Sequence, residues 1–159
     1  MSSRDAAIVA LADAVKFESD GRDFYLRAAQ QAENPLAKSV FLVLADDEKD
    51  HLRRVREIYE QLKDKPGWPE VGAVAARQAG VMDAFEAAAA NLAGNVAADA
   101  DVEAALHTAI GMEQKGLAFY RERLGDASCD NEAEFYRSLV EEEELHLKTL
   151  RSVLAELVG

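Results

Sequence analysis

The sequence predicts an all-α protein, a four-helix bundle of two repeated helical hairpins joined by a long crossover. Its composition is the first reason: 49% of the residues are hydrophobic, whereas only three of the 159 are proline and nine are glycine, a balance that favours helices. Secondly, apolar residues recur at steps of three and four along long segments, which places them on one face of a helix. Thirdly, the last two of these segments repeat the first two.

The first two predicted helices cover about residues 5–32 and 35–63. Ser3 is a candidate N-cap for the first helix, and Asn34, followed directly by a proline, provides the N-cap of the second. A cluster of proline and glycine at residues 65–69 ends the second helix. Because the connection between the two helices is short, we expect them to form an antiparallel hairpin.

The last two predicted helices cover about residues 101–124 and 130–158, with a glycine at the end of the first. They should form a second hairpin for the same reason. The connection between the hairpins, about residues 64–100, is long enough to run back along a bundle, and its apolar part at 81–92 could form a short additional helix. A bundle with one long crossover is the ferritin-like arrangement, so we expect residues 1–159 to form a single ferritin-like domain.

The two hairpins match without a gap when the first is shifted by 95 residues. The pattern Glu-x-x-Gly-x-x-Phe-Tyr at residues 18–25 recurs at 113–120, and Glu-x-x-His at residues 48–51 recurs at 143–146. Hairpins repeated in this way can pack about a pseudo-twofold axis. The repeated glutamates and histidines would then meet at the centre of the bundle.

These glutamates and histidines lie on the apolar faces of their helices, where four uncompensated carboxylates would be costly to bury. Four glutamates and two histidines placed in this way form the ligand set of a carboxylate-bridged di-iron site. Glu48 and Glu143 are the expected bridging carboxylates. Carboxylate and imidazole suit iron, and manganese or zinc remain possible. The predicted ligands of two iron ions per chain are Glu18, Glu48, His51, Glu113, Glu143 and His146.

One other acidic residue competes for a ligand position. Glu142 also lies about one turn before His146, but the alignment of the two hairpins selects Glu143. The neighbouring acids, including Asp46 and Asp47, are interpreted as a solvated face.

Two tyrosines lie on the same helix faces as the predicted ligands. Tyr25 follows Glu18 by seven residues, and Tyr120 follows Glu113 by the same distance. Each hydroxyl could bond a ligand carboxylate and so support catalysis, or the ring could simply pack in the core. Both interpretations stay open.

Three further residues are given lesser roles. His107 lies off the apolar face and is interpreted as a surface or packing histidine. Trp68 lies in the turn after the second helix and is expected to cover one end of the bundle or a partner surface. Cys129 is the only cysteine, which leaves no internal disulfide, and no function is assigned to it.

The chain resembles the rubrerythrin family of the ferritin-like superfamily over about residues 5–62 and 101–157, where the two repeated motifs lie. The resemblance implies that the six residues named above are di-iron ligands. It also implies that hydrogen peroxide oxidises the diferrous centre and that an electron donor reduces it again. The expected function is therefore an oxidoreductase, a peroxidase or ferroxidase, that reduces hydrogen peroxide or O₂ or oxidises Fe(II).

The chain differs from the usual rubrerythrin pattern in two ways. Full-length rubrerythrins also carry a rubredoxin-like domain with four cysteines, whereas this chain has one cysteine. We therefore expect an external electron donor such as a rubredoxin-like protein. Rubrerythrins often have a further glutamate three residues after the ligand at Glu113, toward which an iron can move. Gly116 occupies that position, so the sequence does not predict such a movement.

Bacterioferritin has a similar ligand pattern, so the alternative function is non-enzymatic iron binding or storage of the ferritin type. Only 13 residues follow His146, all needed to complete the last helix, and the short fifth helix of ferritin cages is not expected. A structural bundle that keeps an inherited site is a third possibility. We expect the oxidoreductase.

The formal net charge of −12 argues against nucleic acid or an anionic membrane as a partner. No stretch reaches the roughly 18 apolar residues of a membrane-spanning helix, and the N-terminus has no signal-peptide core. We therefore expect a cytoplasmic protein. Because ferritin-like chains commonly pair, we expect a homodimer, for which the 64–100 segment is a candidate contact surface.

Overall fold

The computed structural model describes residues 2–70 and 100–158, and these residues form four long α-helices without any strand. The expected short helix at 81–92, with most of the crossover, lies outside the described residues. The all-α fold is confirmed, and every helix begins and ends within two residues of its predicted bounds. The helices are α1 (Ser3–Gln31), α2 (Pro35–Asp64), α4 (Ala100–Gly125) and α5 (Asp130–Val158).

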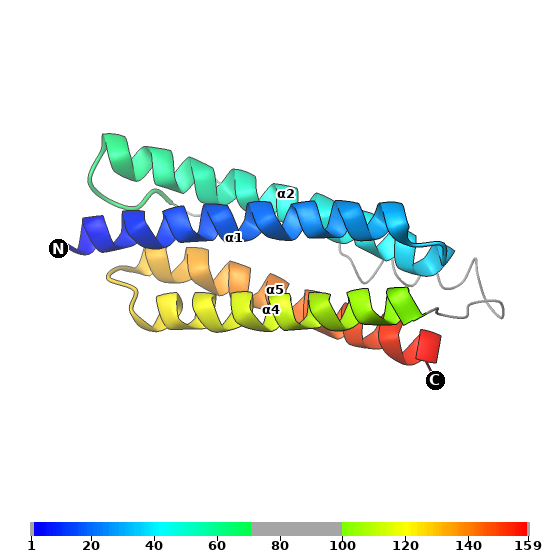
Figure 1. The fold of residues 1–159 in the computed structure, drawn as a ribbon. Coiled ribbons are helices and arrows are strands. Elements are labelled where there is room, and N and C mark those ends of the chain that lie inside the picture. The colour runs from blue at the N-terminus through cyan, green and yellow to red at the C-terminus, as the bar shows by residue number, and fades with distance from the viewer. Residues whose placement is uncertain (1, 71–99, 159) are drawn as a thin grey trace.

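The helices pair as two antiparallel hairpins, α1 with α2 and α4 with α5, which stack on each other as a bundle (Figure 1). The end of α2 and the start of α4 lie at opposite ends of this bundle (Figure 1). This is the topology expected of a bundle with one long crossover.

The caps of the first hairpin explain where its helices start. Ser2, rather than Ser3, is the N-cap of α1: its hydroxyl accepts a hydrogen bond from the backbone of Asp5, and the Asp5 carboxylate accepts one from the Ser2 backbone. This capping box extends the helix beyond the predicted start. Asn34 caps α2 as predicted, accepting a hydrogen bond of 3.0 Å from the Ala37 backbone.

The apolar core consists of two clusters, one toward each end of the bundle. One contains Leu36, Leu44 and Leu106, and the other contains Leu11, Ile58 and Leu139. The predicted metal ligands lie between these clusters along each helix. The two clusters therefore seal the polar middle of the bundle at both ends. None of the helices in the described ranges is long and apolar enough to cross a bilayer.

Candidate metal centre

All six predicted metal ligands meet in the middle of the bundle, and none is more than 2% exposed. The spacing of three residues in Glu-x-x-His puts the glutamate and histidine of each motif on the same face of α2 or α5. The helices α1 and α4 contribute one glutamate each. The residues are Glu18 on α1, Glu48 and His51 on α2, Glu113 on α4, and Glu143 and His146 on α5.

These residues form two overlapping groups, each able to surround one metal ion. One group combines Glu18 and His51 with Glu48 and Glu143, and the other combines Glu113 with His146 and the same two glutamates. Within each group the candidate ligand atoms lie within 4.8 Å of one another. Glu48 and Glu143 belong to both groups, which is the arrangement expected of bridging carboxylates.

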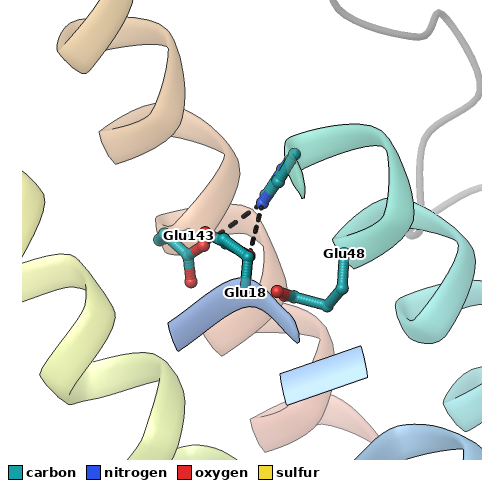
Figure 2. A group of neighbouring side chains, drawn as sticks. Glu18, Glu48 and Glu143 are labelled. Carbon is teal, nitrogen blue, oxygen red and sulfur yellow. Dashed lines mark ion pairs between the residues drawn. The ribbon is translucent and has the colours of Figure 1, made fainter. Parts of the chain in front are cut away.

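The distances show that each histidine faces glutamates from both hairpins. His51 Nδ1 lies 3.5 Å from Glu18 Oε2 and 3.5 Å from Glu143 Oε1, the two ion pairs drawn in Figure 2. His146 Nδ1 lies 3.6 Å from Glu48 Oε1 and 3.6 Å from Glu113 Oε1. Figure 2 also shows Glu18, Glu48 and Glu143 pointing toward a common centre from three different helices.

Both tyrosines bond a carboxylate of the site, and each does so across the hairpins. The hydroxyl of Tyr25 donates a hydrogen bond of 2.6 Å to Glu113 Oε1, and that of Tyr120 donates one of 2.5 Å to Glu18 Oε1. Of the two interpretations left open by the sequence, the structure therefore shows the contact with the glutamates. Each bond fixes one outer carboxylate and leaves its second oxygen buried without a hydrogen-bond partner among the described residues.

The sequence interpretation missed two acidic residues that contact the outer nitrogens of the histidines. Asp47 Oδ2 lies 3.1 Å from His146 Nε2, and Glu142 Oε2 lies 3.5 Å from His51 Nε2. Asp47 was interpreted as part of a solvated face, but its side chain is only 13% exposed. The 95-residue shift pairs Asp47 with Glu142 and could have revealed both. Carboxylates in this position orient a metal-binding imidazole.

A buried arginine supports only one of these acidic residues. The Arg54 guanidinium, 2% exposed, donates through Nη2 to Glu142 Oε2, and its Nε lies 3.2 Å from Asp50 Oδ2. The equivalent position in the second hairpin is Thr149, whose hydroxyl donates a hydrogen bond of 2.9 Å to the backbone oxygen of Leu145. The two histidines thus have different surroundings beyond their acidic neighbours.

The four buried glutamates differ in how tightly they hold a proton. Burial raises the pKa of Glu113, but the neighbouring Glu143 carboxyl and the charge of His146 outweigh it and hold this pKa at about 2. Burial and the charge of Glu113 raise the pKa of Glu143 well above its ordinary value. Likewise, hydrogen bonds outweigh burial to lower the pKa of Glu18, whereas burial and the Glu18 charge raise that of Glu48. The two shared carboxyls therefore keep their protons when no metal neutralises the site.

The histidines supply the matching positive charge. Burial lowers the pKa of His146, but the Glu113 carboxylate outweighs burial and raises this pKa to about 10. The pKa of His51 is also raised, because the charge of Glu18 and a hydrogen bond with Glu142 outweigh burial. The raised pKa values favour the protonated, positively charged form of both imidazoles in the metal-free site. A metal ion can bind only by displacing these protons.

The chemistry of the donor atoms fits a pair of metal ions. Among the described residues, both oxygens of Glu48 and of Glu143, together with Nδ1 of both histidines, are buried without a hydrogen-bond partner. Such orphaned polar groups cost free energy in a core unless something binds them. Hard carboxylate oxygens with imidazole nitrogens suit iron, manganese or zinc. The cluster is therefore compatible with a di-iron site.

A family model for rubrerythrin matches residues 10–154 of the chain. The chain belongs to the rubrerythrin family. The match extends over both hairpins, so the bundle is a ferritin-like fold and the buried glutamate–histidine cluster occupies the middle of the rubrerythrin domain. Comparisons with curated proteins and with solved structures gave no match.

The packing around Gly116 leaves little room for a side chain such as the further glutamate considered at this position. A Cβ atom at Gly116 would lie 2.5 Å from the Phe17 ring and 3.5 Å from Glu143 Oε2. A larger side chain would therefore have to displace Phe17. At the equivalent Gly21, a Cβ would lie 3.3 Å from Glu48 Oε2. Both glycines let a helix backbone approach a shared carboxylate closely.

The remaining candidates lie away from the cluster. His107 has a side chain that is 61% exposed and lies 3.8 Å from Glu103, as expected of a surface histidine. Trp68 packs against Phe135 and Tyr136 beside one apolar cluster. Cys129 is exposed.

Proposed function

We propose that the chain is a di-iron oxidoreductase that reduces hydrogen peroxide, or O₂, with electrons from an external donor. Glu48 and Glu143 would bridge two iron ions, and each ion would also bind one histidine and one outer glutamate. The observation that supports this proposal is that two four-residue groups share the same two buried carboxylates. Membership of the rubrerythrin family points in the same direction.

The residues of the chain bind, orient and shield the centre. Asp47 and Glu142 would hold the histidine rings with Nδ1 toward the metal, and Tyr25 and Tyr120 would hold the outer carboxylates. The apolar clusters on either side keep bulk water out of the middle of the bundle. Bound iron would supply the redox chemistry, because two Fe(II) ions give the two electrons that convert one peroxide and two protons into two water molecules.

Partner and assembly remain predictions. A rubredoxin-like protein is a suitable external donor, because a one-electron carrier could return the electrons one at a time. A homodimer and a cytoplasmic location are expected from the sequence on the grounds given above.

Anaerobic metal analysis followed by a peroxide stopped-flow experiment tests the proposed function. We expect two iron ions per chain and rapid oxidation of two Fe(II) ions for each peroxide consumed. Glu48→Ala, which removes a shared carboxylate, is the control that should lose this reaction.

The alternative of iron storage gives a different result. Hundreds of iron ions per assembly would favour a store, and oxidation no faster than that of free Fe(II) would exclude the oxidoreductase. A chain that holds no transition metal and is unaffected by a chelator would favour a purely structural bundle.

A further inference from the structure

A row of three aromatic side chains leads from the candidate metal centre to the surface. It begins at Tyr120, which bonds Glu18, and its ring centroid lies 6.1 Å from that of Tyr136. The Tyr136 ring lies 5.7 Å from Trp68. Tyr120 and Tyr136 are buried, whereas Trp68 is half-buried. Each ring is thus in contact with the next, and the last one reaches solvent.

The first hairpin has no equivalent row. Tyr25, the counterpart of Tyr120, has the rings of Phe24 and Phe41 as its aromatic neighbours, at 5.5 Å and 6.2 Å. Phenylalanine is far harder to oxidise than tyrosine or tryptophan. The chain has four tyrosines and one tryptophan, and all five lie in the described ranges. Of the two tyrosines that bond a carboxylate of the site, only Tyr120 is joined to a tryptophan by ring contacts within those ranges, through Tyr136.

We propose that Tyr120, Tyr136 and Trp68 form a path for single electrons between the metal centre and the protein surface. The proposal rests on the proposed function, which supplies hydrogen peroxide as the oxidant. Peroxide takes two electrons, but a centre that holds a single Fe(II) provides only one. The path supplies the second electron, and the surface end of the path is then reduced by the external donor.

The electron and proton movements balance along this path. One electron leaves Tyr120 for the oxidised centre, and the phenolic proton moves along the existing hydrogen bond to Glu18 Oε1. Trp68 then returns one electron to Tyr120, which regains its proton from Glu18, and the indole loses its own proton to solvent. One electron and one solvent proton from the donor restore Trp68.

Tyr136 acts as the ring that links the two ends and keeps its proton throughout. Its hydroxyl has no hydrogen-bond partner among the described residues, and burial raises its pKa. Among the described residues, it therefore has no hydrogen-bonded acceptor that could take up its proton. Tyr120 differs because its hydroxyl already donates to a carboxylate, which makes it the residue that can lose an electron and a proton together.

Freeze-quench EPR and peptide mass analysis of protein loaded with a single Fe(II) per chain test the path. After a peroxide pulse without external reductant, we expect an organic radical and oxidation products on the peptide that carries Trp68. Tyr120→Phe should abolish the oxidation of Trp68. Trp68→Phe should remove the tryptophan radical and leave a longer-lived tyrosine radical.

Matched controls separate the path from other causes. Tyr59→Phe removes the hydroxyl of a tyrosine that belongs neither to the row nor to the metal centre and should leave the oxidation of Trp68 unchanged. Protein loaded with Zn²⁺, which has no redox chemistry, should show no oxidation of Trp68. Equal oxidation of Trp68 in the zinc form, or equal loss in both tyrosine variants, would overturn the proposal.

The failure of the path and the failure of the proposed function are distinguishable. Rapid oxidation of Fe(II) with Trp68 left intact would overturn the path and leave the oxidoreductase in place. If the protein does not accelerate the oxidation of Fe(II), both proposals are wrong.

Discussion

In the first hairpin, Arg54 of α2 reaches across the bundle to the acidic neighbour of His51, whereas in the second hairpin the hydroxyl of Thr149 donates to the backbone of its own helix, α5. Similarly, Tyr25 packs against Phe41, but its counterpart Tyr120 packs against Tyr136. The groups that would touch metal are the same in both hairpins. The two hairpins therefore have identical residues at the predicted ligand positions, where metal chemistry limits the choice of donor atom. They differ at the residues that contact those ligands. Two chemically identical ligand sets can therefore have different surroundings.

The largest expected effect comes from removing a carboxylate that both groups share. Glu143→Ala should reduce the metal content from two ions per chain to nearly none, because each group would lose a ligand. Glu18→Ala, which affects a single group, should lower it to about one. Metal analysis after anaerobic loading compares the two variants. Equal loss in both would mean that the groups are not bridged as proposed.

The second effect concerns the protons of the metal-free site. The pKa of His146 is about 10 in the folded chain and 6.5 in the reference state. The folded chain therefore binds this proton more tightly, and the resulting stability is present below about pH 6.5 and is lost as the pH rises through 10. The raised pKa values of Glu48 and Glu143 act in the same direction. The pKa of Glu113 is lowered from 4.5 to about 2, so this carboxylate stabilises the folded chain above pH 4.5. That stability is lost only in acid, as the pH falls from 4.5 toward 2.

The free energy of unfolding of the metal-free protein should therefore fall by several kcal/mol from about pH 6 to about pH 10, at about 1.4 kcal/mol for each unit of pKa shift. Urea unfolding in the presence of a chelator measures this change. Metal affinity should show the opposite trend and rise with pH, because the ligands must lose their protons. Stability that is constant across this range would contradict the protonation states described above.

The third effect tests the difference between Arg54 and Thr149 directly. Arg54→Ala should lower the free energy of unfolding by about 1–3 kcal/mol, less than a fully buried ion pair would, because Glu142 is 27% exposed. Thr149→Ala should cost about 1 kcal/mol or less, since the hydrogen bond that it removes is a neutral one to the backbone of the same helix. Stepwise Co²⁺ titration should show weaker binding of one ion in Arg54→Ala. Arg54→Lys should restore part of the lost Co²⁺ affinity. If Arg54→Ala and Thr149→Ala had equal effects on stability and on Co²⁺ binding, the proposed difference between the two hairpins would be wrong.

The smallest effect compares the two glycines. Gly21→Ala meets the Glu48 carboxylate at an ordinary close distance, whereas Gly116→Ala must displace the Phe17 ring. Alanine favours a helix over glycine by about 0.5–1 kcal/mol, which should make Gly21→Ala slightly stabilising. Gly116→Ala should be less stable than Gly21→Ala by about 1 kcal/mol. Thermal unfolding of the metal-free variants measures this difference, and a reversed order would show that Phe17 moves freely.

The fold and the meeting of the six residues could be predicted because they depend on periodicity and on an internal repeat. The step of three residues from Glu48 to His51 fixes their shared face whatever surrounds them. The partners across the bundle could not be predicted in the same way. Nothing local indicates that His51 lies beside Glu143, because this contact depends on how the hairpins are stacked.

The missed contacts have the same physical origin. Asp47 was interpreted as a solvated acid and Glu142 as the rejected alternative to Glu143, since each lies one position away from a predicted ligand along its helix. Each acid contacts a histidine of the other hairpin, Asp47 with His146 and Glu142 with His51, so the contacts depend on how the hairpins pack. Arg54 was missed because charged residues are rarely buried, and one of its two acidic partners, Glu142, comes from the other hairpin.

Because each four-residue group draws on both hairpins, neither hairpin alone contains a complete site. On the ribosome, Glu18, Glu48 and His51 emerge long before the residues of α5 that complete their group. The growing chain therefore has neither four-residue group complete until α5 has been made and docked. Metal occupancy would then report that the two hairpins have come together.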